Sequence, residues 1–457
     1  MASTYLQRTP SNNYYTEATF SFWFKRSGLS SDIGLFGRKG TNQTAYGTFC
    51  HFGGDDTLLI NFRDSGGTSQ YYMITNRKFR DTSAWYHIHL IIDGNNATQG
   101  DRSRLYINGV RETDFALLNN PSSTGFAIST FLTTGEDLTV GRSLRSQTNT
   151  FHNLDGSMTH FHCVTGTAYE PTVFGETDAT TGIWKPITAP SVTYGTDGFF
   201  LKFENSGAFG TDSSGNSNNF TVNGTMTQTI DTPSNVFATW NPLAGFALPN
   251  GGFSNGNTTA TQGGNTSWTG AISNLGVNSG KYYCEIKWTT TGQYSLFGFI
   301  PSSEIDHLGA LGQTGNTHYG LYYSGDLFVL ENGSTSSVSS FSSAISSGDI
   351  VQLALDKDNN KMYWGINGTW QNSANPSAGT GGYSIGYLTD EYWHFAINQR
   401  TDSGNGTMQI NFGNGFFGTT AVSSAQNPDD GIGIFEFSPP TGYKSLCTKS
   451  INSQEYD

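Results

Sequence analysis

The 457-residue sequence has few charged side chains, and their balance is negative. Charged residues make up 13 % of the chain and give a net charge of −13. A negative protein repels both the phosphates of nucleic acids and the anionic headgroups of lipids, so this composition gives neither partner electrostatic support. The sequence therefore predicts no nucleic-acid partner and no role at a membrane surface.

Long apolar runs are also missing. A membrane-spanning helix needs about 18 consecutive apolar residues, and no stretch of this sequence approaches that length. The opening residues, MASTYLQR, lack the apolar segment of a signal peptide. The sequence predicts no membrane insertion, and if the protein leaves a cell, we expect it to do so by another route, such as lysis.

Cysteine is scarce. Cys50, Cys163, Cys284 and Cys447 lie too far apart in the sequence for a zinc motif or a dense disulfide framework. Each is surrounded by apolar residues, so we expect four small buried side chains. A pair of disulfides is the alternative.

Helical periodicity is absent as well, so we expect no helix longer than a single turn in a loop. Glycine and aromatic residues are abundant instead, with 57 glycines and an aromatic content of 14 %. Together with Ser, Thr and Asn, glycine interrupts the chain about every ten residues, as turns do in all-β proteins.

Alternating apolar residues indicate the strands. The phrase TFSFWFK puts Phe20, Phe22 and Phe24 on one face and Thr19, Ser21 and Lys25 on the other. Two further sets fall on single faces in the same way: Phe199, Leu201 and Phe203, and Tyr282, Cys284, Ile286 and Trp288. This pattern predicts strands with one buried face and one solvated face.

One phrase occurs twice, as HLIIDGNNATQGDRSRLYINGV in residues 89–110 and as DIVQLALDKDNNKMYWGINGTW in residues 349–370. In each copy an apolar strand ends in Asp, a turn follows, and a second strand ends in Asn-Gly, a pair that tolerates positive φ and reverses the chain. The count from Asp to the Asn-Gly pair is 15 residues in the first copy and 11 in the second, and the turn absorbs this difference, because insertions there cost little. We infer two β-sandwiches in tandem, joined near residues 231–245.

Several phrases of the first half stand out: ATFSFWFKRS (18–27), AWYHIHLIID (84–93), RLYINGV (104–110), LTVGR (138–142) and LDGSM (154–158). Together they resemble a laminin-G/concanavalin A-like jelly roll. The second half contains SGKYYCEIKW (279–288), FGFI (297–300), YGLYYSGD (319–326), GDIVQLALDKDNNKMYWGINGTW (348–370) and MQINFGNG (408–415), which resemble an SPRY domain. These resemblances imply an all-β fold of two tandem concanavalin A-like jelly-roll β-sandwiches. Residues 1–232 would form the laminin-G-like sandwich, and residues 233–457 the SPRY-like sandwich with a C-terminal tail.

The combination also includes YLQRTP (5–10), DGFFLKFENSG (197–207), DSSGNSNNF (212–220) and FEFSPPTGYKSLCT (435–448). As a whole it resembles virion proteins of marine tailed bacteriophages. This resemblance implies a structural protein located in the virion, in a tail fibre or another surface appendage that recognises a glycan or protein receptor on the host cell. The expected partners are other virion proteins and the host surface, and we expect a homo-oligomer, with a trimer as the usual fibre state. A purely architectural role, in capsid decoration or as a tail adaptor, is the alternative, and a polysaccharide-degrading enzyme is a third possibility.

No set of catalytic residues is evident. Glycosidases use two carboxylates that flank the scissile bond, and the nearest phrase here, residues 176–181, lacks the second one. No nucleophile elbow, phosphate-binding glycine loop or oriented Cys–His pair occurs. The sequence therefore predicts no catalytic residue and no enzymatic activity.

Metal ligands are sparse. Asp93, Asn95 and Asp101 lie in the long turn after an apolar strand, where laminin-G-like domains sometimes hold calcium. The resemblance makes these three residues a candidate calcium site, and a solvated acidic loop is the alternative. We expect no other metal and no cofactor.

Two other patterns are less specific. The pairs His87/His89 and His160/His162 each share a strand face and could hold a metal together only if their strands were neighbours. The phrase DKDNN (356–360) begins like a calcium loop but lacks the later Gly and Glu that an EF-hand needs, so it predicts a hairpin turn.

Aromatic residues of the second half are candidate ligand contacts. Sugar rings present apolar C–H faces that stack on aromatic rings, while their hydroxyls form hydrogen bonds with polar side chains. At positions that resemble SPRY loops, we predict Tyr322, Tyr323, Asp326 and Trp370 as ligand-binding residues. The alternative is that these rings pack in the core.

Overall fold

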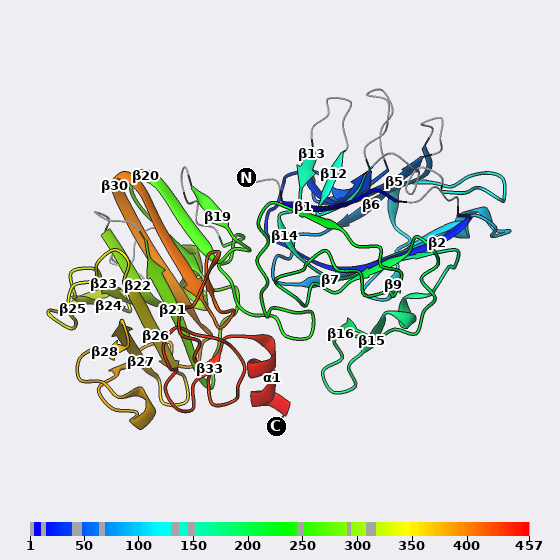
Figure 1. The fold of residues 1–457 in the computed structure, drawn as a ribbon. Helices are drawn as coiled ribbons and strands as arrows, with labels where there is room; N and C mark the ends of the chain where they lie inside the picture. Colours follow the sequence, from blue (N-terminus) through cyan, green and yellow to red (C-terminus); the bar gives the residue numbers. More distant parts are fainter. Residues whose placement is uncertain are drawn as a thin grey trace. The chain divides into compact units, whose positions relative to one another are not determined.

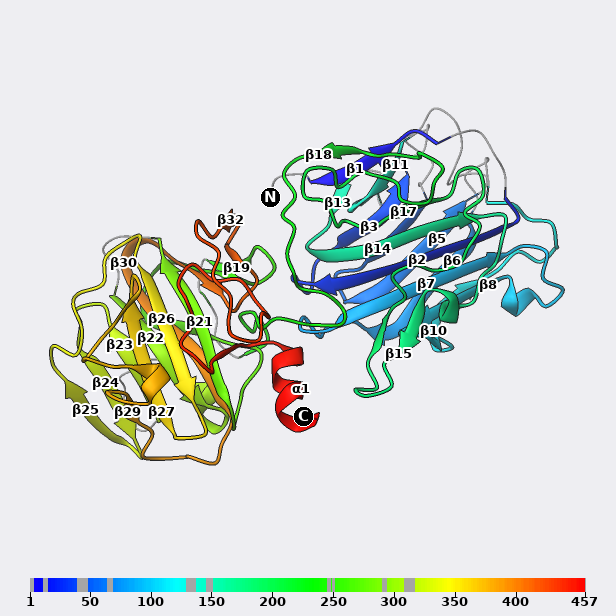
Figure 2. The same cartoon turned by 60° about the horizontal axis from the view of Figure 1, so that its bottom comes forward.

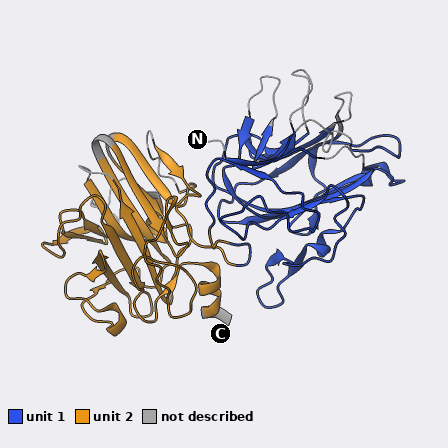
Figure 3. Cartoon of the chain, viewed as in Figure 1, with its two compact units in different colours: residues 1–228, 232–234 blue, residues 229–231, 235–457 orange. Residues whose placement is uncertain are grey.

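The computed structural model describes residues 4–10, 15–38, 48–63, 69–128, 137–144, 151–244, 248, 251–289, 294–307 and 317–456. The chain divides into two compact units, residues 1–228 with 232–234 and residues 229–231 with 235–457 (Figure 3). The predicted boundary after residue 232 falls in the short segment where the chain passes from one unit to the other. Each unit has a hydrophobic core of its own.

Unit 1 is a sandwich of two antiparallel sheets (Figures 1 and 2). In the described part of unit 1, the larger sheet has the strand order β10 (Phe115–Asn119), β6 (Ser69–Lys78), β5 (Thr57–Arg63), β4 (Phe49–Phe52), β3 (Ile33–Arg38), β11 (Leu138–Val140), β1 (Tyr5–Arg8), β18 (Thr221–Asn223). The smaller sheet has the order β17 (Phe199–Leu201), β14 (Gly156–Thr165), β2 (Glu17–Arg26), β7 (Trp85–Asp93), β8 (Ser103–Ile107), β9 (Val110–Arg111). The described part of unit 1 also contains two hairpins, β12 (Arg142–Leu144) with β13 (Phe151–Asn153) and β15 (Gly175–Thr177) with β16 (Trp184–Pro186). Two short 3₁₀ turns lie at Gln99–Asp101 and Pro171–Val173.

The core of unit 1 lies between the two sheets. Phe20, Phe22 and Phe24 of β2 are fully buried in it, which confirms the predicted inward face. Phe22 stacks on Phe161 of β14 with ring centroids 4.9 Å apart, and Phe20 stacks on Phe36 of β3 at 5.4 Å. Full burial of each such ring contributes about 2 kcal/mol to the free energy of unfolding, so aromatic side chains carry much of the stability of this core.

The opposite face of β2 is buried too, and the predicted solvated face is therefore wrong. Thr19, Ser21 and Lys25 are at most 5 % exposed. Residues 169–194, here called the cover segment, lie over this face of the smaller sheet and include the β15–β16 hairpin (Figure 1). The backbone N–H of Tyr169, for example, donates to Thr19 Oγ1 at 2.9 Å. Polar outward residues thus bond to a distant part of the chain instead of to water.

In the described part of unit 2, thirteen strands form one hydrogen-bonded network. Its main path has the order β25 (Ser334–Val338), β24 (Leu327–Glu331), β23 (His318–Tyr322), β22 (Tyr294–Pro301), β30 (Trp393–Asn411), β21 (Lys281–Trp288), β26 (Ile350–Asp356), β27 (Lys361–Ile366), β28 (Thr369–Trp370). Off this path, β20 (Thr259–Ile272) pairs with β30 and with β19 (Gly252–Ser254), β29 (Tyr383–Ser384) pairs with β27, and β33 (Lys444–Ser445) pairs in parallel with β21. The remaining elements are β31 (Phe416–Phe417), β32 (Thr420–Ala421), the 3₁₀ turns Ser302–His307 and Pro376–Ala378, and helix α1 (Thr448–Tyr456).

The long strand β30 joins the two layers of unit 2. Residues 393–400 pair with β22, and residues 408–411 pair with β21. β20 lies beside β30 over most of its length (Figures 1 and 2). One continuous strand therefore belongs to both layers of the sandwich.

The core of unit 2 contains the residues of β21 that the alternation predicts to be buried. Tyr282, Cys284, Ile286 and Trp288 are all buried in it. On the opposite face of β21, Tyr283 and Glu285 are buried as well, under residues 435–445, here called the C-terminal strap. Both units therefore cover a sheet face that the sequence pattern marks as solvated.

The repeated phrase forms the same hairpin in both units, which confirms the predicted turns. Asn108 follows β8 and Asn367 follows β27, with φ angles of 51° and 47°, and each is followed by a glycine with positive φ. In each copy the side-chain oxygen of the Asn accepts a hydrogen bond from the preceding strand, from His87 N at 2.7 Å and from Ile350 N at 2.9 Å. The DKDNN phrase forms the turn between β26 and β27.

All four cysteines are free and buried. Cys50 and Cys163 lie in the core of unit 1, and Cys284 and Cys447 are buried in unit 2. The predicted role as small buried side chains is confirmed, and the disulfide alternative is wrong.

Helix α1 contradicts the prediction that helices are limited to a single turn, because it spans nine residues. Its segment, TKSINSQEY, has one aliphatic residue, Ile451, and so shows no helical periodicity. Ile451 packs against the core and Ser450 is fully buried, so tertiary packing stabilises the helix. In the part of the chain that the structure describes, no helix is long and apolar enough to cross a membrane.

Candidate functional site

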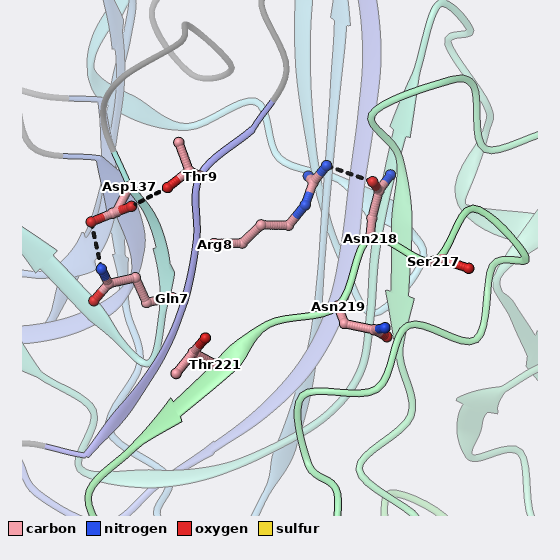
Figure 4. A pocket seen from close by; sticks show the side chains of 8 residues that line it. All are labelled: Gln7, Arg8, Thr9, Asp137, Ser217, Asn218, Asn219 and Thr221. Carbon is pink, nitrogen blue, oxygen red and sulfur yellow. Dashed lines mark hydrogen bonds between the residues drawn. The ribbon is translucent and has the colours of Figure 1, made fainter.

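A polar pocket lies at the edge of the larger sheet of unit 1, beside β1 and β18 (Figure 4). Its volume is about 420 Å³, a size at which protein pockets enclose small ligands. The lining side chains are all polar or charged: Gln7, Arg8, Thr9, Asp137, Ser217, Asn218, Asn219 and Thr221. They come from three parts of the chain that are far apart in the sequence.

Asp137 fixes one wall of the pocket. It immediately precedes β11, and its carboxylate accepts hydrogen bonds from Gln7 Nε2 at 2.5 Å and Thr9 Oγ1 at 2.7 Å. The side chain of Leu6 is buried in the core, so residues 7 and 9 of the extended chain point to the opposite side. Both therefore reach the carboxylate of Asp137. This wall is anchored by the strand pairing of β1 with β11.

Arg8 lies between the two walls. Its Nη2 donates to Asn218 Oδ1 at 2.5 Å, as Figure 4 shows. Burial lowers the pKa of Arg8, while Asp197 and Asp212 act in the opposite direction. Its Nη1 is buried and has no hydrogen-bond partner among the described residues. Arg8 thus places a fixed positive charge in the pocket.

The second wall is an ordered loop centred on Asp212. The carboxylate of Asp212 accepts hydrogen bonds from the backbone N–H groups of Phe200, Ser214 and Asn218, each at 2.8 to 2.9 Å. The loop also contains Ser217, a non-glycine residue with a φ of 60°. Sequence reasoning did not assign this wall, although Asp and Asn side chains that bond nearby backbone are the usual signal of such loops.

Several groups that line the pocket remain available for a ligand. Within the described residues, the hydroxyls of Ser217 and Thr221 and the amide nitrogen of Asn219 make no hydrogen bond. In contrast, the side chains that shape the walls, Asp137 and Asn218, are held by other residues. A rigid pocket with free donors and acceptors is suited to a ligand rich in hydroxyl groups.

Residues 2–162 match the laminin G model of the concanavalin A-like lectin/glucanases superfamily. This match confirms the predicted similarity of the first half to that superfamily. It includes residues 7–9 and Asp137 of the polar pocket, whereas residues 217–221 lie beyond it. No curated protein sequence matches the chain.

Three solved structures are similar to parts of the chain. The SPRY domain of human HERC1 is 14 % identical, with 37 % of this chain and 96 % of that chain covered and a TM-score of 0.26. A native heptameric SAP-like pentraxin from Limulus polyphemus is 13 % identical, with 37 % and 72 % covered and a TM-score of 0.26. The TRIM65 PSpry domain is 12 % identical, with 38 % and 89 % covered and a TM-score of 0.27.

The structure brings together three of the four predicted ligand-binding residues. Tyr322 ends β23, its ring lies 4.6 Å from that of Tyr323, and its backbone N–H donates to the carbonyl oxygen of Asp326 at 2.8 Å. Trp370 lies elsewhere, in β28, where its ring contacts Tyr283 at 6.3 Å. Ligand binding by these four residues stays a prediction.

The three predicted calcium ligands face different neighbours. Asp93 accepts a hydrogen bond within its own turn, Asn95 donates to Glu17 Oε1 at 3.2 Å, and Asp101 pairs with Arg111 at 2.5 Å. No group of three or more His, Cys, Asp or Glu side chains that could hold a metal ion occurs among the described residues. Calcium binding at Asp93, Asn95 and Asp101 stays a prediction.

The two histidine pairs do not lie on neighbouring strands, because β2 separates β7 from β14. His87, His89 and His162 pack instead against the cover segment. Trp184 Nε1–H donates to His87 Nδ1 at 2.9 Å, so the proton of this neutral ring is on Nε2, which faces Ser21 Oγ at 2.7 Å. These imidazoles fill a buried layer of unit 1.

Residues 176–181 form β15 and the turn after it. Asp178 accepts hydrogen bonds from the backbone N–H groups of Thr180 and Thr181 and from Lys185 Nζ, at 2.8 to 3.1 Å. The bond from Lys185 is the main cause that lowers the pKa of Asp178. This acid stabilises a turn and keeps its charge.

Proposed function

We propose that the protein recognises a glycan at a cell surface through the polar pocket of unit 1. The observation that carries this proposal is the lining of the pocket, in which every described residue is polar or charged and the hydroxyls of Ser217 and Thr221 and the amide nitrogen of Asn219 have no hydrogen-bond partner among the described residues. Sugars offer many hydroxyls that bond to Asp, Asn, Gln and Arg side chains. The match of residues 2–162 to a superfamily that includes lectins supports a carbohydrate ligand.

Binding without hydrolysis fits the acids of this pocket. A glycosidase uses two carboxylates about 5 to 10 Å apart on either side of the scissile bond. Among the described residues that line the pocket, Asp137 supplies the one carboxylate, and it is held by two hydrogen bonds. Asp197 and Asp212, the two acids that raise the pKa of Arg8, are at most 9 % exposed. We therefore assign the pocket to binding and not to catalysis.

The biological setting that we propose is a phage virion, in a tail fibre or another surface appendage that attaches to the host. The support is the resemblance carried by the phrases at residues 5–10, 197–207, 212–220 and 435–448. Many copies facing one cell would convert weak binding at each pocket into firm attachment, so we propose a homo-oligomer, most simply a trimer, that also contacts other virion proteins.

A binding assay with purified host envelope polysaccharide tests the role of the pocket. We expect the protein to be retained on immobilised polysaccharide, and Asp137→Ala to weaken binding about tenfold because it removes a charged acceptor and frees two pocket side chains. Asp114→Ala is a matched control, since Asp114 also accepts from a side-chain amide, Asn76 Nδ2 at 2.6 Å, outside the pocket. If the unmodified protein is not retained, or both variants bind alike, this proposal is wrong.

One observation favours a second candidate, an architectural role within the particle. Val110, Leu117 and Leu118 are 69 %, 40 % and 43 % exposed, and they lie on β9 and β10, the edge strands of the two sheets of unit 1. Exposed apolar edge strands are places where other chains add. In this case Leu117→Lys with Leu118→Lys should abolish incorporation into particles and leave polysaccharide binding unchanged.

A further inference from the structure

A closed group of four aromatic rings lies in unit 2. Trp268, Tyr294, Tyr322 and Tyr323 are all partly exposed. Neighbouring ring centroids lie 6.5 Å apart for Trp268 and Tyr294, 5.9 Å for Tyr294 and Tyr323, 4.6 Å for Tyr323 and Tyr322, and 6.4 Å for Tyr322 and Trp268. Each ring therefore touches two others. These four residues are called the aromatic patch.

Trp268 and Tyr322 of the patch pack on the outer side of the layer that contains β20, β30, β22 and β23, whereas Tyr323 packs against the main core of unit 2, with its ring centroid 6.3 Å from that of buried Trp288. Alternation along β22 sends Phe297 into the core and its neighbour Leu296 to the opposite face. Four residues of that face, each at most 2 % exposed, form an apolar floor against which Trp268 and Tyr322 pack: Ile272, Leu296, Ile300 and Ala396. The floor fixes the rings, so little conformational entropy is lost when a ligand binds.

A peptide cannot add as a strand to β22 or β23, which hold Tyr294 and Tyr322 of the patch. β22 is hydrogen-bonded to β30 on one side and β23 on the other, and β23 is bonded to β22 and β24. Recognition by strand addition needs an unpaired edge. A ligand that lies over β22 and β23 is therefore recognised by side chains, which suits a flat ring with an apolar face.

Polar groups beside the patch balance in charge. The guanidinium of Arg400 lies 5.2 Å from the ring centre of Tyr294, and the carboxylate of Asp326 is held by Ser340 N at 3.0 Å and Ser324 Oγ at 3.1 Å. Among the described residues, this one cation and this one anion balance, and the chain as a whole carries −13. This balance favours a neutral ligand over a polyanion.

We propose that the aromatic patch is a second ligand site, which binds neutral polysaccharides built from hexopyranose rings. The apolar face of a sugar ring stacks on Trp268 and Tyr322, and the sugar hydroxyls bond with the tyrosine hydroxyls, Asp326 and Arg400. The site does not depend on the polar pocket of unit 1. It retains Tyr322, Tyr323 and Asp326 of the predicted set and replaces Trp370 by Trp268 and Tyr294.

Affinity electrophoresis of the full chain in native gels that contain dextran, laminarin or galactomannan tests this site. We expect slower migration in at least one of these gels than in a gel without polysaccharide. Loss of each stacked ring should weaken binding about tenfold, so Trp268→Ala and Tyr322→Ala should each reduce the retardation strongly. If thermal melting shows that either variant does not fold, Tyr294→Ala takes its place in the binding test, because the Tyr294 ring does not pack on the apolar floor.

Two control variants test whether the retardation depends on the aromatic patch. Tyr392→Ala removes a tyrosine of the same unit that is 53 % exposed and outside the patch, and it should migrate like the unmodified protein. Asp114→Ala, which removes a carboxylate of unit 1 outside the polar pocket, should also leave retardation in these gels unchanged. The proposal is overturned if the unmodified protein is not retarded in any of the three gels, or if the folded patch variants are retarded as strongly as it is.

Discussion

The two units bury the second face of a sheet in chemically different ways. In unit 1 the cover segment packs on neutral imidazoles, those of His87, His89 and His162. In unit 2 the C-terminal strap is held by one carboxylate, since Glu285 accepts hydrogen bonds from Glu436 N at 2.9 Å and Phe437 N at 2.8 Å. A polar residue at an outward strand position can therefore be the attachment point for a distant segment.

These two kinds of attachment respond to pH in opposite directions. Burial lowers the pKa of His89 to about 3, so its contribution to stability is present above the ordinary pKa of about 6.5 and is lost as the pH falls below that value. Burial raises the pKa of Glu285 to about 7, so its contribution is present below the ordinary value of 4.5 and is lost as the pH rises through 7.

The largest expected effect is the loosening of the cover segment by acid. Between pH 7 and pH 5 each buried histidine should cost about 1.4 kcal/mol for every pH unit below its ordinary pKa, because the folded state excludes the proton that the unfolded state binds. Hydrogen exchange measured by mass spectrometry should show faster exchange, corrected for intrinsic rates, in residues 169–194 than in residues 435–445. Equal loss of protection in the two segments would contradict the comparison.

Removal of the carboxylate should loosen the strap selectively. Glu285→Ala leaves two buried backbone N–H groups without an acceptor and should lower the free energy of unfolding of unit 2 by about 3 kcal/mol. Urea denaturation and exchange in residues 435–445 measure the change. Glu285→Gln is the matched control, because its amide oxygen can still accept hydrogen bonds and its effect should be smaller. If residues 435–445 also lose protection from hydrogen exchange in the Gln variant, the negative charge of Glu285, and not its ability to accept hydrogen bonds, holds the strap.

The repeated hairpin should give the smallest effects, and equal ones in both units. Asn108→Ala and Asn367→Ala each remove one side-chain acceptor and place alanine at positive φ, so each should lower the free energy of unfolding by about 1 to 2 kcal/mol. The Asn→Gly variants keep the backbone conformation accessible and should cost less. Urea denaturation checks both pairs, and a cost confined to one unit would show that the two hairpins are not equivalent.

Local patterns in the sequence predict the inner halves of both sandwiches. Period-two alternation identifies the buried sets in β2 and β21, and Asn-Gly identifies the reversals after β8 and β27, because these signals depend on neighbouring residues only. The similarity of the first half to the concanavalin A-like superfamily is also recognisable from its phrases.

The cover segment, the C-terminal strap and the polar pocket could not be predicted from local sequence patterns. The pocket joins residues 7–9 and Asp137 to residues 217–221, and no local pattern reports that these segments meet. The SPRY resemblance predicts Trp370 and Tyr322 as residues of one ligand site. In the structure, however, Trp370 packs near Tyr283 beneath the C-terminal strap. The burial of Ser21 and Glu285 depends on segments more than a hundred residues away.

The dual membership of β30 has a consequence for how the chain is made. Because residues 393–411 belong to both layers of unit 2, we expect neither layer to close before the ribosome has released that strand. Unit 1 is complete by residue 234, so it should already be folded while most of unit 2 is still being translated. The strands that pair with β30, namely β20, β21 and β22, then wait the longest for their partner, and in that interval the nascent protein is most exposed to aggregation.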